Sequence, residues 1–327
     1  MKISKKLGII LAAAATLPLS ACGGNTETLA VYAPDGAPAL AFSAMMSEGF
    51  DGAEFTVVAP TTIAAHVSNG DADIAVMPVN AAAALYNGGL DITMLSVNTH
   101  GNLYFVGDAE ADMTLEKLKG ARVGVIGQAQ VPDLTLRMLL GENGIEYVVS
   151  ETARDGAVAL RYAADGSALM PLLKQGAIDY AFIAEPAATT ACERFGKEIV
   201  LDAQQLWRDS FGSDYPQACV VAKNDVIKNN KSFVDRFLKK LADTEGWAQE
   251  HPAEAVSAVG AHTDGTGSTL TALDADTVKR CNIKHVSAAD ARTACESFFD
   301  KLTQLNDADF AKPPLAKKPD DGFYHGA

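Results

Sequence analysis

Basic and aromatic residues are both scarce in this sequence. It contains 27 Lys and Arg against 41 Asp and Glu, a formal net charge of −14, and only 7% aromatic residues. Nucleic acids and anionic membrane surfaces attract proteins through clustered Lys and Arg, so this charge balance argues against both as partners. The acidic excess mainly keeps the protein soluble.

The short motifs of common enzymes are also missing. There is no H-E-x-x-H, no G-x-S-x-G, no P-loop and no G-x-G-x-x-G after a predicted strand, and the six histidines are scattered. We therefore expect no catalytic residues, no metal site and no cofactor.

An apolar run that approaches membrane-spanning length occurs only at the N-terminus. Three lysines precede an apolar segment over 7–17, and Leu19-Ser20-Ala21-Cys22 follows directly. The pattern resembles a bacterial lipoprotein signal, which implies a signal peptide over 1–21, lipidation of Cys22 and a short linker over 22–27. The alternative is an ordinary secretory signal that is cleaved nearby.

Beyond Cys22 the chain has four cysteines, which are Cys192, Cys219, Cys281 and Cys295. An even number in an exported protein allows three pairings. Cys281 and Cys295 lie fourteen residues apart in a helical, polar region and are the favoured bridge. Cys219 lies in an apolar, strand-like run and is predicted to be a buried free thiol.

One phrase occurs twice, about a hundred residues apart. Residues 70–80 read GDADIAVMPVN and residues 176–186 read GAIDYAFIAEP. A helix-like segment precedes each phrase, so its glycine reads as a helix C-cap and its apolar run as a buried strand. The repeat predicts one helix–turn–strand unit in each half of the chain, although such connections also look alike by coincidence.

Strands and helices alternate along the chain, which favours parallel sheets covered by helices on both faces. We predict helices over 39–47, 131–142 and 167–175, others ending near Asn69 and Gly88, and a long amphipathic run over 231–252. The remainder to about 306 is expected to be helical and loop-like, and the Pro- and Lys-rich tail to lie along the surface or stay disordered. The predicted strands cover 28–33, 55–60, 73–78, 91–108, 121–127, 147–151, 179–185 and 217–223.

Several segments in this order resemble ABC-transporter substrate-binding proteins, in particular the group serving nitrate, alkanesulfonates, taurine and thiamine-pyrimidine precursors. They are the lipobox, PDGAP (34–38), the repeated phrase, LEKLKGARVGVIG (115–127) and FLKKLADTEGWAQEHPAEA (237–255). The resemblance covers nearly all of residues 28–260.

The resemblance implies an α/β, two-lobed type II periplasmic-binding-protein fold with a ligand cleft between the lobes. The first lobe would comprise 28–107 and 217–306, the second lobe 108–216, and 307–327 a C-terminal tail. Ligands of open parallel sheets bind beyond the carboxyl ends of the strands, so those ends predict the ligand-binding residues. They are Asp35, Gly36, Thr61, Thr62, Asn80, Asn98, Gly127, Gln128, Glu185 and Tyr215.

Some of these residues have a simpler alternative role. Asp35, Thr61, Thr62 and Asn80 are also typical helix caps. Two carboxylates and no Lys or Arg favour a neutral or cationic nitrogen heterocycle, stacked on a tyrosine such as Tyr215. An alkanesulfonate, taurine or nitrate-like anion held by backbone amides is the alternative.

The implied function is extracytoplasmic capture of a small molecule by closure of the two lobes. The implied partners are the permease and ATPase subunits of an ABC importer, with membrane attachment through the lipid anchor only, and the protein is expected to be a monomer. A pyrimidine-biosynthesis-like enzyme on the same fold is the alternative from a different class.

Overall fold

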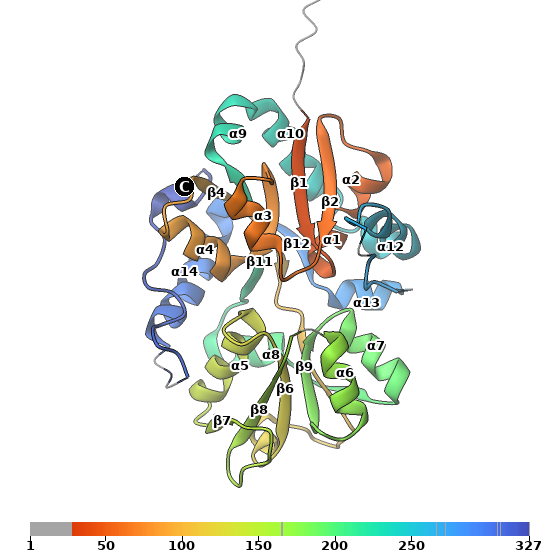
Figure 1. Cartoon of the computed structure of the whole chain (residues 1–327), viewed down its shortest axis with the longest axis vertical. Helices are drawn as coiled ribbons and strands as arrows, with labels where there is room; N and C mark the ends of the chain where they lie inside the picture. The colour runs from red at the N-terminus through yellow and green to blue at the C-terminus, as the bar shows by residue number, and fades with distance from the viewer. Residues whose placement is uncertain are drawn as a thin grey trace, which may run out of the picture.

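The computed structural model describes residues 28–326 apart from 165, 266, 272, 306 and 308. The predicted signal peptide (1–21), the linker (22–27) and Cys22 lie outside the described residues. Within them the chain forms two six-stranded sheets, each covered by helices, and Figure 1 shows the two resulting α/β lobes one above the other. No described helix is both long enough and apolar enough to cross a bilayer.

The first lobe is built on a sheet with the strand order β12-β4-β11-β3-β1-β2. β1 pairs in parallel with β2 and β3, whereas β11 lies antiparallel between β3 and β4. The strands are β1 (Leu29–Pro34), β2 (Ala53–Val58), β3 (Ile74–Pro78), β4 (Ile92–His100), β11 (Pro216–Lys223) and β12 (Ile283–Ser287).

The second sheet has the order β10-β5-β9-β6-β8-β7, and β5 is antiparallel to both of its neighbours. The chain leaves the first sheet after His100 and enters the second at Leu103, so the expected single strand over 91–108 is two strands in two sheets. The lobe boundary expected at 107/108 remains a prediction. The strands are β5 (Leu103–Gly107), β6 (Arg122–Ile126), β7 (Tyr147–Val149), β8 (Val158–Ala163), β9 (Tyr180–Ala184) and β10 (Glu198–Asp202).

Helices cover both faces of each sheet. The second lobe carries α5 (Val131–Glu142), α6 (Gly166–Lys174), α7 (Ala187–Phe195), α8 (Ala203–Phe211) and the 3-10 turn η1 (Leu115–Leu118). The first lobe carries α1 (Ala37–Leu40), α2 (Ser43–Glu48), α3 (Ile63–Asn69), α4 (Val79–Asn87), α9 (Asn224–Asn229), α10 (Lys231–Asp243), α11 (Trp247–Glu250), α12 (Pro252–Ala261), α13 (Ala275–Arg280), α14 (Ala288–Gln304) and η2 (Asp321–Phe323).

The repeated phrase forms the same helix–turn–strand unit in each lobe. Gly70 follows α3 with φ of 81° and Gly176 follows α6 with φ of 65°, a left-handed conformation that glycine adopts without steric cost. The strands that follow are β3 in the first sheet and β9 in the second. One such unit therefore stands in each half, as the sequence predicts.

The aspartate of each repeated phrase makes the same pair of hydrogen bonds in its own lobe, which explains why the sequence recurs. The Asp73 carboxylate accepts the Ala30 N–H at 2.9 Å, and the Asp73 N–H donates to the Ala30 carbonyl at 2.9 Å. Asp179 exchanges the same two hydrogen bonds with Arg122, at 2.7 and 2.8 Å. Each aspartate thus ties the start of its own strand to the start of the neighbouring strand.

One hydrophobic core extends through both lobes. It joins Met94 and Phe298 of the first lobe to Leu103 and Trp207 of the second, and smaller cores fill the opposite face of each sheet. The Trp207 ring lies 5.8 Å from that of Phe298, between ring centroids. The lobes are therefore packed against each other on this side.

The expected disulfide between Cys281 and Cys295 is not formed. All the described cysteines are free thiols. Cys281 lies in the core on one face of the first sheet, whereas Cys295 lies in the core that continues into the second lobe. β12, between the two, carries the chain around the sheet edge and separates the two thiols. Cys219 is a buried free thiol, as predicted.

Three stretches depart from the predicted elements. The amphipathic run over 231–252 breaks into α10, α11 and the start of α12, because Gly246 and Pro252 interrupt it. β12 lies in a region expected to contain only helices and loops. The tail is more than a surface segment, since Leu315 and Phe323 are buried and Tyr324 bridges to Met94.

Candidate functional site

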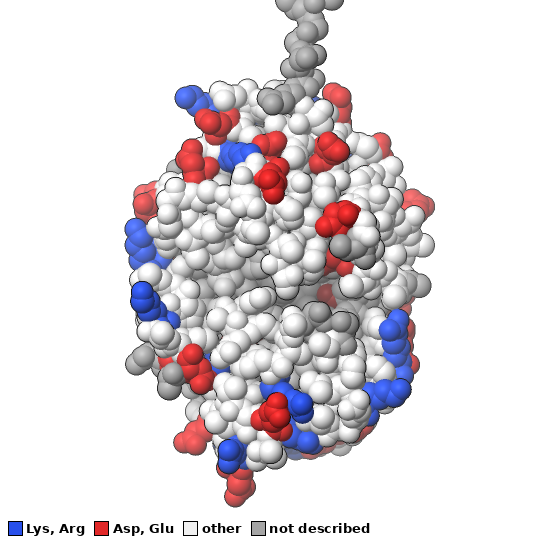
Figure 2. All heavy atoms as spheres, in the orientation of Figure 1, with Lys and Arg blue, Asp and Glu red and all other residues white. Residues whose placement is uncertain are grey.

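The carboxyl ends of the parallel strands of the two sheets face each other. Only Gly101 and Asn102 separate the end of β4 from the start of β5, and β5 runs antiparallel to β9. The ends of β3 and β1 in the first sheet therefore face those of β9 and β6 in the second. Figure 2 shows a furrow between the lobes on this face, with acidic atoms near its right-hand end.

The structure brings the expected residues to these two edges. Asp35 and Gly36 follow β1, and Asn80 follows the neighbouring β3. Gly127 follows β6, and Glu185 follows the neighbouring β9. Each lobe thus gathers its own set at one edge.

The Asp35 carboxylate is already engaged within the first lobe. It accepts hydrogen bonds from the Ser268 hydroxyl and from the N–H and hydroxyl of Thr269, all at 2.6 Å. Gly36 follows with φ of 112° and precedes α1. Asp35 therefore holds the 268–269 loop over the end of β1 and does not cap α1.

Thr61 and Thr62 are exposed beyond β2. Thr62 occupies the N-cap position of α3 without a side-chain capping bond, and its hydroxyl instead donates to the Ala59 carbonyl at 2.9 Å.

Asn98 and Asn80 carry buried amide atoms that have no hydrogen-bond partner among the described residues. Asn98 is 1% exposed and both of its amide atoms are buried and unpartnered, whereas Asn80 has one such atom, Oδ1. Their strands are separated by β11 alone, where Ala218 lies beside both Thr99 and Pro78. A buried polar atom without a partner costs about 1–3 kcal/mol, so these amides are the clearest sign of a binding position.

The loop after β6 has an unusual backbone. Gly127 has φ of 62° and Ala129, a residue with a Cβ, has φ of 63°. This conformation costs a non-glycine residue about 1–2 kcal/mol. The Ala129 N–H donates to the Asp133 carboxylate at 2.7 Å, which offsets part of the cost. Gln128, between the two, is exposed.

The Glu185 carboxylate forms an ion pair between the lobes. Its Oε1 lies 2.7 Å from Nε of Arg280 at the end of α13, and it also accepts the N–H and hydroxyl of Thr189 at 2.9 and 2.7 Å. The Tyr104 hydroxyl donates to the Arg280 carbonyl at 3.1 Å. Burial works to lower the pKa of Arg280, but its bond to Glu185 outweighs this and the pKa is raised. Sequence reasoning missed Arg280, because no local pattern marks a partner 95 residues away.

Replacing Glu185 with glutamine should lower the free energy of unfolding by about 1–3 kcal/mol. The change keeps the size of the side chain but removes the charge that Arg280 faces, and hydrogen bonds to charged groups contribute about 1.5–3 kcal/mol. Urea unfolding measures the loss. Asp235→Asn, in an exposed pair with Lys231, is the control and should change stability by less than about 0.5 kcal/mol. Equal effects of the two changes would contradict the prediction.

Tyr215 lies in the core rather than at either edge. It is fully buried against Trp207 and Phe298, and burial raises the pKa of its hydroxyl well above the usual range. This position does not support stacking on a ligand.

A cavity of about 420 Å³ also lies between the lobes, beside Gly101, where the chain passes from β4 to β5. None of the ten residues expected from the sequence lines it. Its walls are mixed in charge and come from Gly101, Tyr104, Asp202, Gln204, Arg208, Asp276, Lys279, Arg280 and Asn282. Within the described part of the chain, no cluster of His, Cys, Asp and Glu side chains could hold a metal ion.

Comparisons with known proteins agree on the fold. Residues 33–261 match the model of the NMT1-like family. An ABC transporter from Parabacteroides distasonis shares the fold with a TM-score of 0.73 and 23% identity, over 91% of this chain and 98% of that one. The periplasmic aliphatic sulphonate binding protein of Escherichia coli gives 0.60 and 12%, over 84% and 92%. No curated protein sequence matches the chain. The expected two-lobed, periplasmic-binding-protein fold is confirmed.

Proposed function

The chain belongs to the NMT1-like family, and from this membership we propose that it is the solute-binding component of an ABC import system, located outside the cytoplasm. The permease and ATPase subunits of such a system are its proposed partners. Attachment through lipidated Cys22 and a monomeric state belong to the same proposal. The protein binds its small molecule and releases it without chemical change.

The observation that carries this proposal is the pair of facing sheet edges with unpartnered amides. Asn98 and Asn80 offer donor and acceptor atoms from the first lobe, and the loop at Gly127 and Gln128 follows β6 at the opposing edge of the second. A ligand that contacts both edges gains its full set of bonds only when the lobes meet. Binding therefore shifts the equilibrium toward the closed arrangement.

The chemistry of these atoms favours a neutral nitrogen heterocycle over a cation. The carboxylates of Asp35 and Glu185 already have hydrogen-bonding partners within the protein, so neither is free to pair with a charged ligand. A free side-chain amide both donates and accepts, as an aminopyrimidine does. The ligand class we propose is thus a small aminopyrimidine-like molecule.

An alkanesulfonate or similar anion is the second candidate. The N-terminus of α5, a helix of twelve residues, follows β6 at the same edge of the second sheet, and helix N-termini favour negative charge. The sulphonate-binding protein of Escherichia coli shares the fold.

A thermal-unfolding screen tests the proposal with 4-amino-2-methylpyrimidine, taurine, ethanesulfonate and nitrate. A true ligand at 100 times its Kd should add about 2.7 kcal/mol of stability. We expect the pyrimidine to do so and to be recovered unchanged. Stabilisation by ethanesulfonate alone would contradict the aminopyrimidine class and favour an alkanesulfonate ligand. Turnover of the pyrimidine would contradict simple binding and indicate an enzyme.

Asn98→Leu sharpens this test. Because the amide has no partner in the protein, an apolar side chain of similar shape should leave the ligand-free protein as stable or more stable, yet weaken pyrimidine binding at least tenfold. Ser96→Ala is the matched control, since its hydroxyl on the same strand is also buried and unpartnered but lies deeper in the sheet. It should leave affinity unchanged. Isothermal calorimetry measures both, and equal affinities of the two variants would remove Asn98 from the site.

A further inference from the structure

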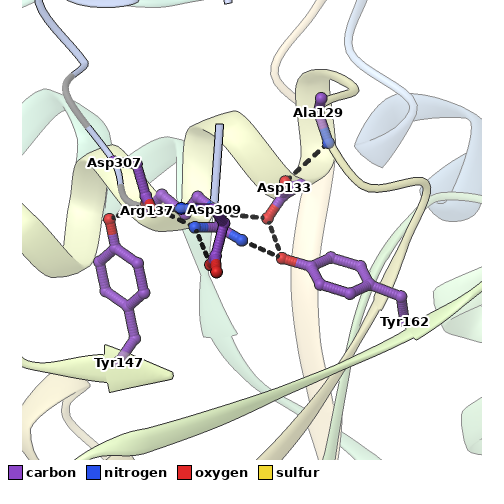
Figure 3. Close-up of polar contacts among 7 residues, drawn as sticks. All are labelled: Ala129, Asp133, Arg137, Tyr147, Tyr162, Asp307 and Asp309. Atoms are coloured by element: carbon purple, nitrogen blue, oxygen red, sulfur yellow. Dashed lines mark hydrogen bonds and ion pairs between the residues drawn. The ribbon is translucent and has the colours of Figure 1, made fainter. Parts of the chain in front are cut away.

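Arg137 on α5 is fully buried in a cluster of polar groups that the proposed binding site does not include. Its Nε donates to Asp133 at 2.8 Å and its Nη2 to the Tyr162 hydroxyl at 2.7 Å. Its Nη1 donates to Asp309 at 2.8 Å and also contacts Asp307. Figure 3 shows the guanidinium enclosed by these groups.

Two of the carboxylates around Arg137 come from the part of the chain that follows α14, which we call the C-terminal segment. Asp307 and Asp309 follow α14, whose body packs on the first sheet, and Asp307 also accepts the Tyr147 hydroxyl of the second lobe at 2.7 Å. Phe310 places its ring 4.8 Å from the guanidinium carbon. Figure 1 shows this segment descending to the level of α5 before the chain returns to the first lobe. The segment therefore links the lobes in addition to the two crossovers of the chain, between β4 and β5 and between α8 and β11.

The other side of the cluster reaches the loop after β6. Asp133 is the third residue of α5 and is fully buried. One of its oxygens accepts from Arg137 and Tyr162, while the other accepts the Ala129 N–H at 2.7 Å. In Figure 3 the Ala129 N–H and the guanidinium approach this one carboxylate from different directions. A carboxylate at a helix N-terminus is also favoured by the helix dipole.

We propose that Asp133 is a positioning residue for the 127–130 loop, and that Asp307 and Asp309 support it through Arg137. The carboxylate holds Ala129 in its left-handed conformation, and Arg137 fixes the carboxylate. The C-terminal segment thereby takes part in ligand binding without touching the ligand. This inference rests on the proposed function, because the loop matters only if it contacts a ligand.

Amide hydrogen exchange in the ligand-free, ¹⁵N-labelled protein tests the positioning role. Ala129 is exposed, so protection of its amide depends on the bond to Asp133. Asp133→Ala should speed exchange at Ala129 about tenfold relative to Val125, a buried residue of β6 that reports on general unfolding. Tyr162→Phe removes a neutral bond to the other oxygen of the same carboxylate but keeps its ion pair with Arg137, so it should change this ratio less than twofold. Unchanged exchange in Asp133→Ala, or equal acceleration in both variants, would overturn the proposal.

The support from the C-terminal segment has its own variant. Asp307→Asn keeps the carboxylate of Asp133 and should still speed exchange at Ala129 relative to Val125, by about threefold. If Asp133→Ala fails to fold, faster exchange at Ala129 in Asp307→Asn still shows that the cluster positions the loop. An unchanged ratio would mean that the C-terminal segment has no part in positioning the loop.

Calorimetry with 4-amino-2-methylpyrimidine connects the loop to binding. Asp133→Ala should weaken binding at least tenfold and Tyr162→Phe less than threefold, whereas a purely structural role would weaken both in proportion to their loss of stability. If the wild-type protein does not bind the pyrimidine, the proposed ligand class fails. Exchange at Ala129 then decides the positioning role alone.

Discussion

Replacing Arg137 with methionine should lower the free energy of unfolding by about 3–5 kcal/mol. The change leaves the carboxylates of Asp133 and Asp307 buried without their positive partner, and breaking a buried ion pair in this way is strongly destabilising. Burial alone would lower the pKa of Arg137, but its bonds to Asp133, then Asp307 and Asp309, outweigh this and raise it. The guanidinium is therefore charged throughout the accessible pH range.

Urea unfolding at pH 7 measures the loss. Arg122→Met is the matched control, because Arg122 pairs with Asp179 but is partly exposed, and it should cost about 1–2 kcal/mol. Equal losses of unfolding free energy in the two variants would contradict the prediction, because the burial of Arg137 would then not increase the cost of breaking its ion pairs.

The same cluster should make stability depend on acid pH. Burial works to raise the pKa of Asp307, but the Asp309 N–H, the Tyr147 hydroxyl and Arg137 outweigh it and hold the pKa below its usual range. A lowered carboxyl pKa adds stability above the unfolded value of about 4, and this is lost as the pH falls through the folded value. Arg137→Met should show a weaker loss below pH 4 than the wild type.

Replacing Trp207 with alanine should cost about 3–5 kcal/mol, the range for removing a large aromatic side chain from a core. Trp207 is 1% exposed and packs on Phe211, Tyr215 and Phe298, so its ring belongs to the core that both lobes share. The cavity left behind would lie between the lobes. We therefore expect looser coupling between them as well as lower stability.

Circular dichroism in urea separates the two effects. The wild type should unfold in one transition, whereas Trp207→Ala should unfold earlier and over a broader range as the lobes become less coupled. Trp247→Ala is the control, since Trp247 is only partly buried and stacks on His251, and it should keep the single transition. A sharp single transition in Trp207→Ala would contradict the loss of coupling.

The parts of the fold that sequence predicts are those with a local signal. The two repeated phrases carry their own turn glycines and apolar strands, so the helix–turn–strand units were predictable. β5 was not separated from β4, because the polar residues 98–102 between their apolar runs do not show locally that the chain changes sheets there. β12 and the C-terminal contacts of Phe323 depend on residues far along the chain.

The same distinction applies to the site. Strand ends predicted where Asp35, Asn80, Gly127 and Glu185 would lie, because sheet topology alone fixes that placement. The sequence could not show that Glu185 pairs with Arg280, or that Asp35 holds the 268–269 loop. An acidic residue three positions after Gln130 was a usable signal for Asp133, since such residues often bond back to the start of a helix.

The buried thiols bear on how a fluorescent reporter could be attached to this protein. Burial raises the pKa of Cys295 to about 12, and it also raises those of Cys192, Cys219 and Cys281. Labelling reagents attack thiolates, so these four side chains should react slowly near neutral pH. A cysteine introduced at exposed Gln128 would then take up a dye selectively once Cys22 is replaced, and a change in its emission on adding a solute would test whether the 127–130 loop takes part in binding.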